Sequence, residues 1–199
     1  MLLHGLNKRH IEVGCDEAGR GSIAGPVVAA AVILPRNFSH ILLNDSKQVS
    51  KKNREFLNRL IRKKALAYSI GIVSSHEIDK INVLNASILA MHKALDQIKI
   101  SFDSVLVDGN RFHTYKDMEH HCIIKGDSKY LNIAAASILA KTFRDGLMID
   151  LDSQFPKYYW GKNKGYPTKA HRAAIREFGN NLHHRLSFRL LPEQLKLKI

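Results

Sequence analysis

The chain has 199 residues, of which 45% are hydrophobic and 25% are charged. This composition is typical of a folded globular protein and excludes a largely disordered chain. No apolar run approaches the ~20 residues of a membrane-spanning helix, and the first residues lack the pattern of a secretory signal. Only Cys15 and Cys122 are present, which is too few for a disulfide framework. We therefore expect a reduced, cytoplasmic protein without membrane attachment.

Positive charge is the unusual feature, because 31 Lys and Arg residues against 18 acidic ones give a net charge of +13. Residues 47–64 hold 8 basic residues and one acidic residue, and residues 157–199 hold 10 and two. Either stretch alone would be read as a solvated surface. Two such stretches favour a polyanion partner, above all nucleic acid. Neither has the wide apolar face and aromatic anchors of a membrane-surface helix.

The first half of the chain predicts three strands and one helix. Apolar and polar residues alternate over 10–17, which predicts a half-buried strand. After a glycine-rich turn, the continuous apolar run 26–34 predicts a strand covered on both faces, so the two form a hairpin. Ser50 predicts the start of a helix over 51–65, and residues 67–73 a third strand. The apolar side chains that we expect to face inward from this helix are Phe56, Leu57, Leu60 and Ile61.

The second half predicts further helices between shorter strands. Ser74 and Glu77 fit a capping box for a short helix. Amphipathic spacing predicts the next helix over 84–98. The remaining predicted elements are strands over 104–107 and 121–124, a buried alanine-rich helix over 131–147, and a helix from Thr168 to Gly179. Strands that alternate with helices after an opening hairpin predict an α/β layer fold with a mixed sheet.

Acidic residues stand at three predicted strand ends, as Asp16-Glu17, Asp108 and Asp127. Neighbouring strand ends of an α/β sheet meet at the edge where such folds place their sites. A single acid there is usually a solvated loop residue, but a convergent group needs a compensating cation. Oxygen ligands suit Mg²⁺ or Mn²⁺, and two ions roughly 4 Å apart can clamp both oxygens of a phosphoryl displacement. In a strongly basic chain, this favours metal-dependent chemistry on nucleic acid.

The stretch Val13 to Leu34, VGCDEAGRGSIAGPVVAAAVIL, closely resembles the opening motif of ribonuclease HII, the bacterial type 2 ribonuclease H. The resemblance covers nearly the whole chain in the expected order. It continues through Asn44-Asp45-Ser46-Lys47, Ile81-Asn82, Val107 to Asn110, Lys125 to Lys129, Ile133 to Lys141, Lys164 to Thr168 and His184 to Phe188. The chain departs from the family pattern at Ser22, where proline is common, and at Asn180-Asn181-Leu182, where a proline-containing segment is expected.

The resemblance implies a ribonuclease H fold, with a five-stranded mixed sheet flanked by helices and a helical C-terminal extension. We expect one catalytic domain over 1–199, with a basic helical region from about 155 to 199, and a monomer. The family's catalytic, metal-binding acids fall on Asp16, Glu17, Asp108 and Asp127, which implies two Mg²⁺ or Mn²⁺ ions. The implied activity is endonucleolytic cleavage of RNA in an RNA–DNA hybrid, leaving 5′-phosphate and 3′-hydroxyl ends.

Substrate-binding residues also follow from the resemblance. A ribonuclease that spares DNA must sense the 2′-hydroxyl, and glycines let a backbone approach a sugar closely. In the family, the turn Gly19-Arg20-Gly21 contacts the ribonucleotide and the ring of Tyr166 lies against the neighbouring sugar. These contacts predict cleavage 5′ to a single ribonucleotide embedded in duplex DNA. Lys47 is a candidate phosphate contact, and basic residues after 157 are candidates for the duplex backbone.

Two other interpretations stay open at this point. The sister family, ribonuclease HIII, carries a substrate-binding domain ahead of its catalytic motif and lacks a strict GRG turn, whereas here the motif begins at Val13. A non-catalytic RNA-binding or ribosomal-type protein would fit the charge but does not need convergent acids. The pairs His120-His121 and His183-His184 lack the spacing of zinc ligands. We expect Tyr158, Tyr159 and Trp160 to pack rather than stack on bases.

Overall fold

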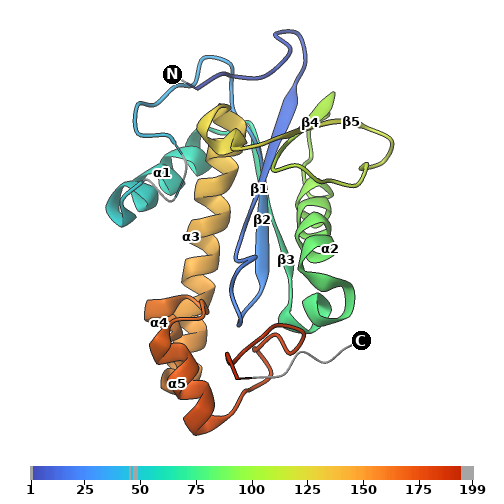
Figure 1. The fold of residues 1–199 in the computed structure, drawn as a ribbon. Helices are drawn as coiled ribbons and strands as arrows, with labels where there is room; N and C mark the ends of the chain where they lie inside the picture. The colour runs from blue at the N-terminus through green and yellow to red at the C-terminus, as the bar shows by residue number, and fades with distance from the viewer. Residues whose placement is uncertain (1, 45, 47–48, 194–199) are drawn as a thin grey trace.

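The computed structural model describes residues 2–44, 46 and 49–193. Five strands form one sheet in the order β3-β2-β1-β4-β5, with helices on both of its faces (Figure 1). The strands are β1 (Glu12–Ala18), β2 (Val27–Ile33), β3 (Ala67–Val73), β4 (Ser104–Asp108) and β5 (Glu119–Ile123). The helices are α1 (Lys51–Lys64), α2 (Ser75–Leu95), α3 (Leu131–Gln154), α4 (Trp160–Asn163) and α5 (Lys169–Phe178), with short 3₁₀ helices at Gly126–Ser128 and Pro156–Tyr158. The predicted five-stranded mixed sheet is confirmed.

Strand β1 lies at the centre of the sheet, antiparallel to β2 and parallel to β4. The predicted hairpin is therefore confirmed. The prediction of a half-buried β1 is wrong, because the residues from Glu12 to Asp16 are all buried. Helix α3 covers the face that carries the polar residues: a Cβ atom on Gly14 would clash with the backbone of Asn132 and Ile133. The alternating pattern therefore did not predict that both faces of β1 are buried.

Two helical layers enclose the sheet. Helix α2 packs on one face so closely that a Cβ atom on Gly71 of β3 would clash with the carbonyl of Ala90. Helix α3 covers the other face, and α1 packs beside α3 (Figure 1). Leu57 and Ile61 of α1 face this core as predicted, but Phe56 is 43% exposed. That prediction for Phe56 is wrong because it lies at the edge of the buried stripe.

The helix ends follow their predicted caps. Ser50 and Thr168 each accept a backbone N–H at the start of a helix, and Ser74 forms a complete capping box with Glu77. The short helix and the 84–98 helix join into α2 across a kink at Asn82, whose φ is 65°. Asn82 Oδ1 accepts the N–H groups of Leu84 and Asn85, so it starts the second part. Helix α3 runs past its predicted end at 147 and ends at Gln154.

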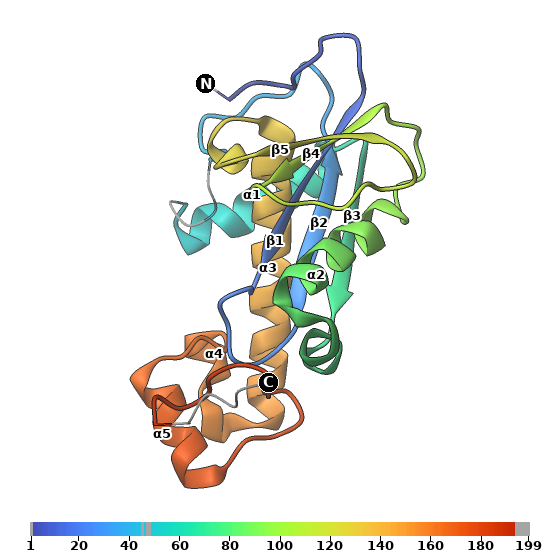
Figure 2. The same cartoon turned by 45° about the vertical axis from the view of Figure 1, so that its right-hand side comes forward.

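The C-terminal region packs around the far end of α3 and the connection between β1 and β2 (Figure 2). Trp160 and Tyr158 are buried there against Ile23 and Met148. A helical C-terminal region is confirmed, although residues 179–193 form turns and extended segments. Residues 194–199, the last part of the predicted helical region, lie outside the described residues. In the described residues, no helix is both long enough and apolar enough to cross a membrane.

Candidate active site

The structure brings the acidic strand ends to one edge of the sheet. Cys15 of β1 pairs with Val107 of β4 in parallel, so Asp16 and Asp108 each follow a paired position on adjacent strands. Asp127 lies in the 3₁₀ helix that follows β5. The N–H group of Gly126 donates to Asp108 Oδ1 at 2.7 Å, which fixes this 3₁₀ helix beside β4. The register of three neighbouring strands therefore positions the predicted acids.

Asp16 is buried beside other acids. Its side chain is buried, and burial raises the pKa of its carboxyl group well above the ordinary value, with the charges of Glu17 and Asp108 adding to the rise. Hydrogen bonds from the Ser137 side chain and from the N–H of Glu17, at 2.6 Å, act in the opposite direction. An ionised Asp16 is therefore costly unless a cation joins the group.

The donor set fits a hard divalent cation in chemical type, because all four predicted ligands are carboxylates. In the structure, Glu17 Oε1 pairs with Arg20 at 3.1 Å, and Asp108 Oδ1 accepts the Gly126 N–H. Among residues 2–44, 46 and 49–193, no three side chains of His, Cys, Asp or Glu lie in an arrangement that could hold a metal ion. The predicted acids thus lie near one another in the strand register, and their role as shared metal ligands stays a prediction.

The predicted substrate-reading turn and ring also lie together. Gly19 adopts a φ of 96°, which a side chain would disfavour, and Gly21 is so close to Tyr166 that an added Cβ would lie 3.8 Å from its ring. The ring is 37% exposed. Lys47 lies outside the described residues. Its neighbour Ser46 has its hydroxyl 2.9 Å from that of Ser137, the residue that also contacts Asp16.

Two buried arginines were not singled out from the sequence. Arg144 of α3 and Arg185 of the C-terminal segment are 1% and 0% exposed, and both donate to backbone carbonyls of the connection between β1 and β2. Ser137, within the Ile133 to Lys141 motif, was likewise given no role. Their partners are distant in sequence and mostly backbone atoms. The signal available beforehand was the position of Arg185 and Ser137 inside family motifs.

The two departures from the family pattern have local structural consequences. Ser22 follows the turn directly, is fully buried, and its hydroxyl finds no hydrogen-bond partner among the described residues. At the second departure, Asn181 orients the buried His184, because its N–H donates to His184 Nδ1 at 3.0 Å.

The aromatic residues of the C-terminal region have a packing role. Trp160 is fully buried and donates from Nε1 to His171 Nε2 at 2.9 Å. Tyr158 stacks on Trp160 with ring centroids 5.0 Å apart. The packing prediction is confirmed for these two residues. It is wrong for Tyr159, which is 55% exposed because the chain turns there with a φ of 56°.

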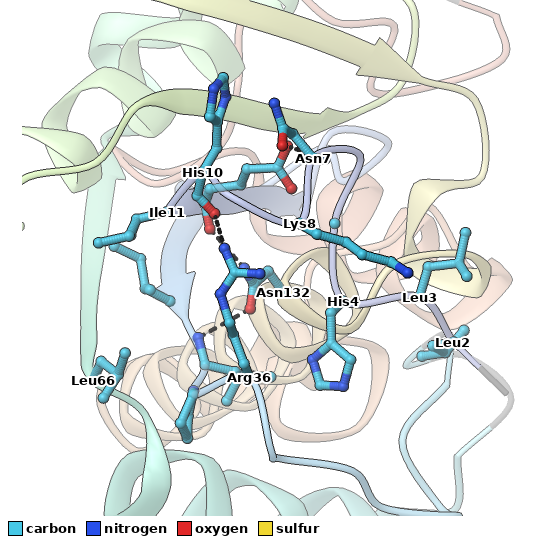
Figure 3. A pocket seen from close by; sticks show the side chains of 15 residues that line it. Leu2, Leu3, His4, Asn7, Lys8, His10, Ile11, Arg36, Leu66 and Asn132 are labelled. Atoms are coloured by element: carbon cyan, nitrogen blue, oxygen red, sulfur yellow. Dashed lines mark hydrogen bonds between the residues drawn. The ribbon is translucent and has the colours of Figure 1, made fainter.

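A cavity of about 700 Å³ lies at the other end of β1, beneath the N-terminal segment (Figure 3). Its wall includes apolar side chains and the buried Glu12. Asn132 accepts the N–H of Leu34 there, and Arg36 donates to the carbonyl of His10. Neither the four acids nor Tyr166 lines this cavity. This cavity is therefore separate from the acidic edge.

Comparisons of the sequence and of the fold find related proteins. The family model described as Ribonuclease HII matches residues 13–191. A ribonuclease HII of Phocaeicola vulgatus is 57% identical over 199 residues, covering 100% of this chain and 99% of that protein. The ribonuclease H2 structure of Pyrococcus horikoshii OT3 matches with a TM-score of 0.73 at 24% identity, covering 90% of this chain and 94% of the other. Bst-RNase HIII in complex with Mn²⁺ matches with a TM-score of 0.71 at 18% identity, covering 89% and 66%.

Proposed function

Because the chain belongs to the ribonuclease HII family and is therefore a ribonuclease, we propose that it hydrolyses the RNA strand of RNA–DNA hybrids and also cuts 5′ to single ribonucleotides embedded in duplex DNA. The products are 5′-phosphate and 3′-hydroxyl ends. The observation that supports this most directly is the buried Asp16, whose pKa is raised by burial and by Glu17 and Asp108. It lies at the strand end from which the substrate-reading turn begins.

Two divalent ions, Mg²⁺ or Mn²⁺, would be held by Asp16, Glu17, Asp108 and Asp127. Such ions supply an activated water and stabilise the leaving oxygen when they are bound. The Mn²⁺ complex of the structurally similar Bst-RNase HIII is consistent with this choice of ions. Arg20 neutralises Glu17 through its ion pair while no ion is shared. A bound ion would replace that arginine, which would then be available to a phosphate.

Recognition of the ribonucleotide would depend on the turn and on Tyr166. The backbone of Gly19-Arg20-Gly21 can approach a 2′-hydroxyl because two of its residues carry no side chain. The Tyr166 ring, next to Gly21, would hold the sugar beside the junction. Together they would place the scissile phosphate at the acids that precede the turn.

The basic surface would attract the duplex. Exposed lysines and arginines of α1, and Lys162 and Lys169 near α5, carry charges that are solvated. Binding through such residues is sequence-independent and depends strongly on salt. They would hold the duplex while the turn and the acids decide where it is cut.

Cleavage mapping tests the proposal. A DNA duplex with one ribonucleotide is incubated with the protein and Mg²⁺ or Mn²⁺, and the ends of the products are determined. We expect one cut 5′ to the ribonucleotide, no cut in the all-DNA duplex, and loss of cutting in EDTA. A non-catalytic RNA-binding protein would bind without cutting. Cutting confined to runs of four or more ribonucleotides would contradict recognition of a single junction.

A further inference from the structure

The connection between β1 and β2, residues 19–26, is held by two buried guanidinium groups. From α3, Arg144 donates through Nε to the carbonyl of Pro26 at 2.8 Å and through Nη2 to that of Ala24 at 3.1 Å. From the C-terminal segment, Arg185 donates through Nε and Nη2 to the carbonyl of Gly25, at 3.0 and 2.8 Å. The partners of both side chains are backbone oxygens rather than acids.

Burying these two charges is costly. In the described part of the chain, neither guanidinium forms an ion pair with a carboxylate. Burial lowers the pKa of Arg144, and it lowers that of Arg185 to about 9. Arginine side chains keep their charge in proteins at neutral pH. An uncompensated buried cation is unfavourable for stability alone. Its presence beneath a substrate-reading turn indicates a functional use.

Arg185 also fixes the direction of one peptide group in the turn. Its Nη1 donates to the carbonyl of Arg20 at 3.1 Å. That carbonyl and the N–H of Gly21 belong to the same planar trans peptide unit, so they point in opposite directions. The carbonyl faces the buried arginine, and the Gly21 N–H therefore faces outward. Within residues 2–44, 46 and 49–193, this N–H has no hydrogen-bond partner.

Arg144 connects the same turn to the segment that carries Tyr166. Its Nη1 donates to the carbonyl of Lys164 at 2.9 Å, and its guanidinium lies 5.8 Å from the centroid of the Tyr166 ring. Gly19 packs directly on it, because an added Cβ would clash with Arg144 Nε. The spacing between turn and ring thus depends on Arg144 together with the Gly165 carbonyl, which accepts the N–H groups of Ile23 and Ala24 at 2.9 and 3.3 Å.

We propose that Arg144 and Arg185 are positioning residues for ribonucleotide recognition: they aim the Gly21 N–H at the substrate and set its distance from the Tyr166 ring. The inference rests on the proposed function, because it assumes that turn and ring read the substrate. Within the described residues their charges form no ion pair, and Asp145 and Asp79 act on them only as nearby charges, so the two cations also favour a phosphodiester at this place.

Lysine variants of the two arginines test the proposal. Arg185→Lys and Arg144→Lys each keep the charge but lose the planar fork that binds several carbonyls at once. Since small misplacements of reacting groups can cost on the order of a hundredfold in rate, we expect kcat on the single-ribonucleotide duplex to fall by about ten- to a hundredfold. Binding of the duplex should change by less than about threefold, because surface cations dominate it.

Two controls separate positioning from folding. Arg36→Lys makes the same replacement where an arginine donates to a single backbone carbonyl, that of His10 at 2.8 Å, away from the turn. Ile61→Val removes a buried methyl group from α1 and lowers stability without touching the turn. Both should keep the wild-type kcat below their melting temperatures. Lysine variants that fold and cut with wild-type kcat would overturn the proposal.

A measurement on the wild-type sequence covers the case in which the lysine variants do not fold. Hydrogen exchange of the Gly21 amide is followed by NMR on the full chain in Ca²⁺, with a duplex that contains one ribonucleotide or none. We expect the Gly21 amide to be protected only with the duplex that contains the ribonucleotide. Equal exchange with the two duplexes would refute the proposal that this N–H faces the substrate. Wild type that fails to cut the ribonucleotide duplex with Mg²⁺ or Mn²⁺ contradicts the proposed function itself, which is a distinct result.

Discussion

The two ends of β1 each carry a buried acid, and the two acids are in opposite circumstances. Glu12 and Asp16 are both 5% exposed. At the N-terminal end, Glu12 accepts the N–H groups of Leu6 and Asn7 at 2.8 and 3.1 Å. At the C-terminal end, Asp16 faces the carboxylates of Glu17 and Asp108. Both acids lie on the same face of one strand, but only the second meets like charges.

The difference shows that burial of an acid does not by itself make a reactive site. Glu12 holds the N-terminal segment at the cavity of Figure 3, because its oxygens accept backbone N–H groups of that segment. Asp16 also accepts two hydrogen bonds, from the Glu17 N–H and the Ser137 side chain, but it lies beside the charges of Glu17 and Asp108, so its ionised form calls for a cation. The neighbours of each carboxylate, rather than its exposure, separate the structural Glu12 from the predicted catalytic Asp16.

The sharpest way to break this comparison is to neutralise each acid. Asp16→Asn and Asp108→Asn should abolish cleavage, because an amide cannot supply the charge that holds the ions. Substitutions of residues that only support metal ligands cost about 10- to 100-fold, so we expect a larger loss here. Turnover with Mg²⁺ and the circular dichroism melt are measured together, to show that the variants fold.

Glu12→Gln is the matched control for these variants. Its amide group would face one of the two N–H donors that now bind the carboxylate, so stability should fall by about 1–3 kcal/mol. Cleavage by the folded protein should stay at the wild-type level. The distinction between the two ends of β1 fails if Glu12→Gln loses turnover as Asp16→Asn does, or if Asp16→Asn keeps it.

The next largest effect concerns Tyr166, which we expect the acidic end of β1 to need in addition to its acids. Tyr166→Ala removes the ring beside Gly21, and a misplaced phosphate can cost on the order of a hundredfold in rate. Tyr166→Phe keeps the ring and loses only the hydroxyl, so it should remain much closer to wild type. Rates on a single-ribonucleotide duplex and on a long hybrid are compared. An alanine variant that treats both substrates as wild type does would exclude junction reading by the ring.

Sequence reasoning found the acidic edge because register fixes it. Strand ends, glycine turns and caps are local features, and they predicted that Asp16 and Asp108 lie near the ends of neighbouring strands, as the register shows. The catalytic role of these acids stays a prediction. Long-range packing was not predictable in the same way. The alternation along β1 does not reveal that α3 encloses its polar face, and nothing near Arg144 indicates that its partners are carbonyls more than a hundred residues away.

A smaller effect concerns the exposed cations, which contrast with the buried arginines. Affinity for the hybrid should fall steeply with salt, and replacing Lys63 and Lys64 of α1 by Gln should lower the slope of log K against log salt by about 0.7–0.9 per lost contact. Lys116→Gln is the control, because that lysine is paired with Asp96 at 2.7 Å in another loop. Binding curves at several salt concentrations measure this, and a flat dependence would rule out the basic surface.

The smallest expected effect concerns two buried histidines of the C-terminal region. It tests whether these hydrogen-bonded titratable groups have a structural role, as Glu12 has on β1. The His184 and His171 rings lie 3.2 Å apart at their Nε2 atoms, and His184 Nδ1 accepts the N–H of Asn181. Burial, with His171 nearby, lowers the pKa of His184 to about 4. The pKa of His171 is also lowered, chiefly by burial.

Stability should therefore fall as the pH falls from about 6.5 to about 4. In that pH range the histidines of the unfolded chain bind protons, whereas those of the folded chain stay neutral. Proton binding therefore favours unfolding. His184 would contribute a loss of about 2–3 kcal/mol by pH 4. His184→Gln removes this term, whereas the exposed His76→Gln should leave it in place. Denaturant unfolding at pH 7 and pH 5 measures the difference for each protein. Because general acid destabilisation acts on all three, only a smaller pH dependence in His184→Gln than in wild type supports the assignment, and equal dependence would show that the buried ring already exchanges protons freely.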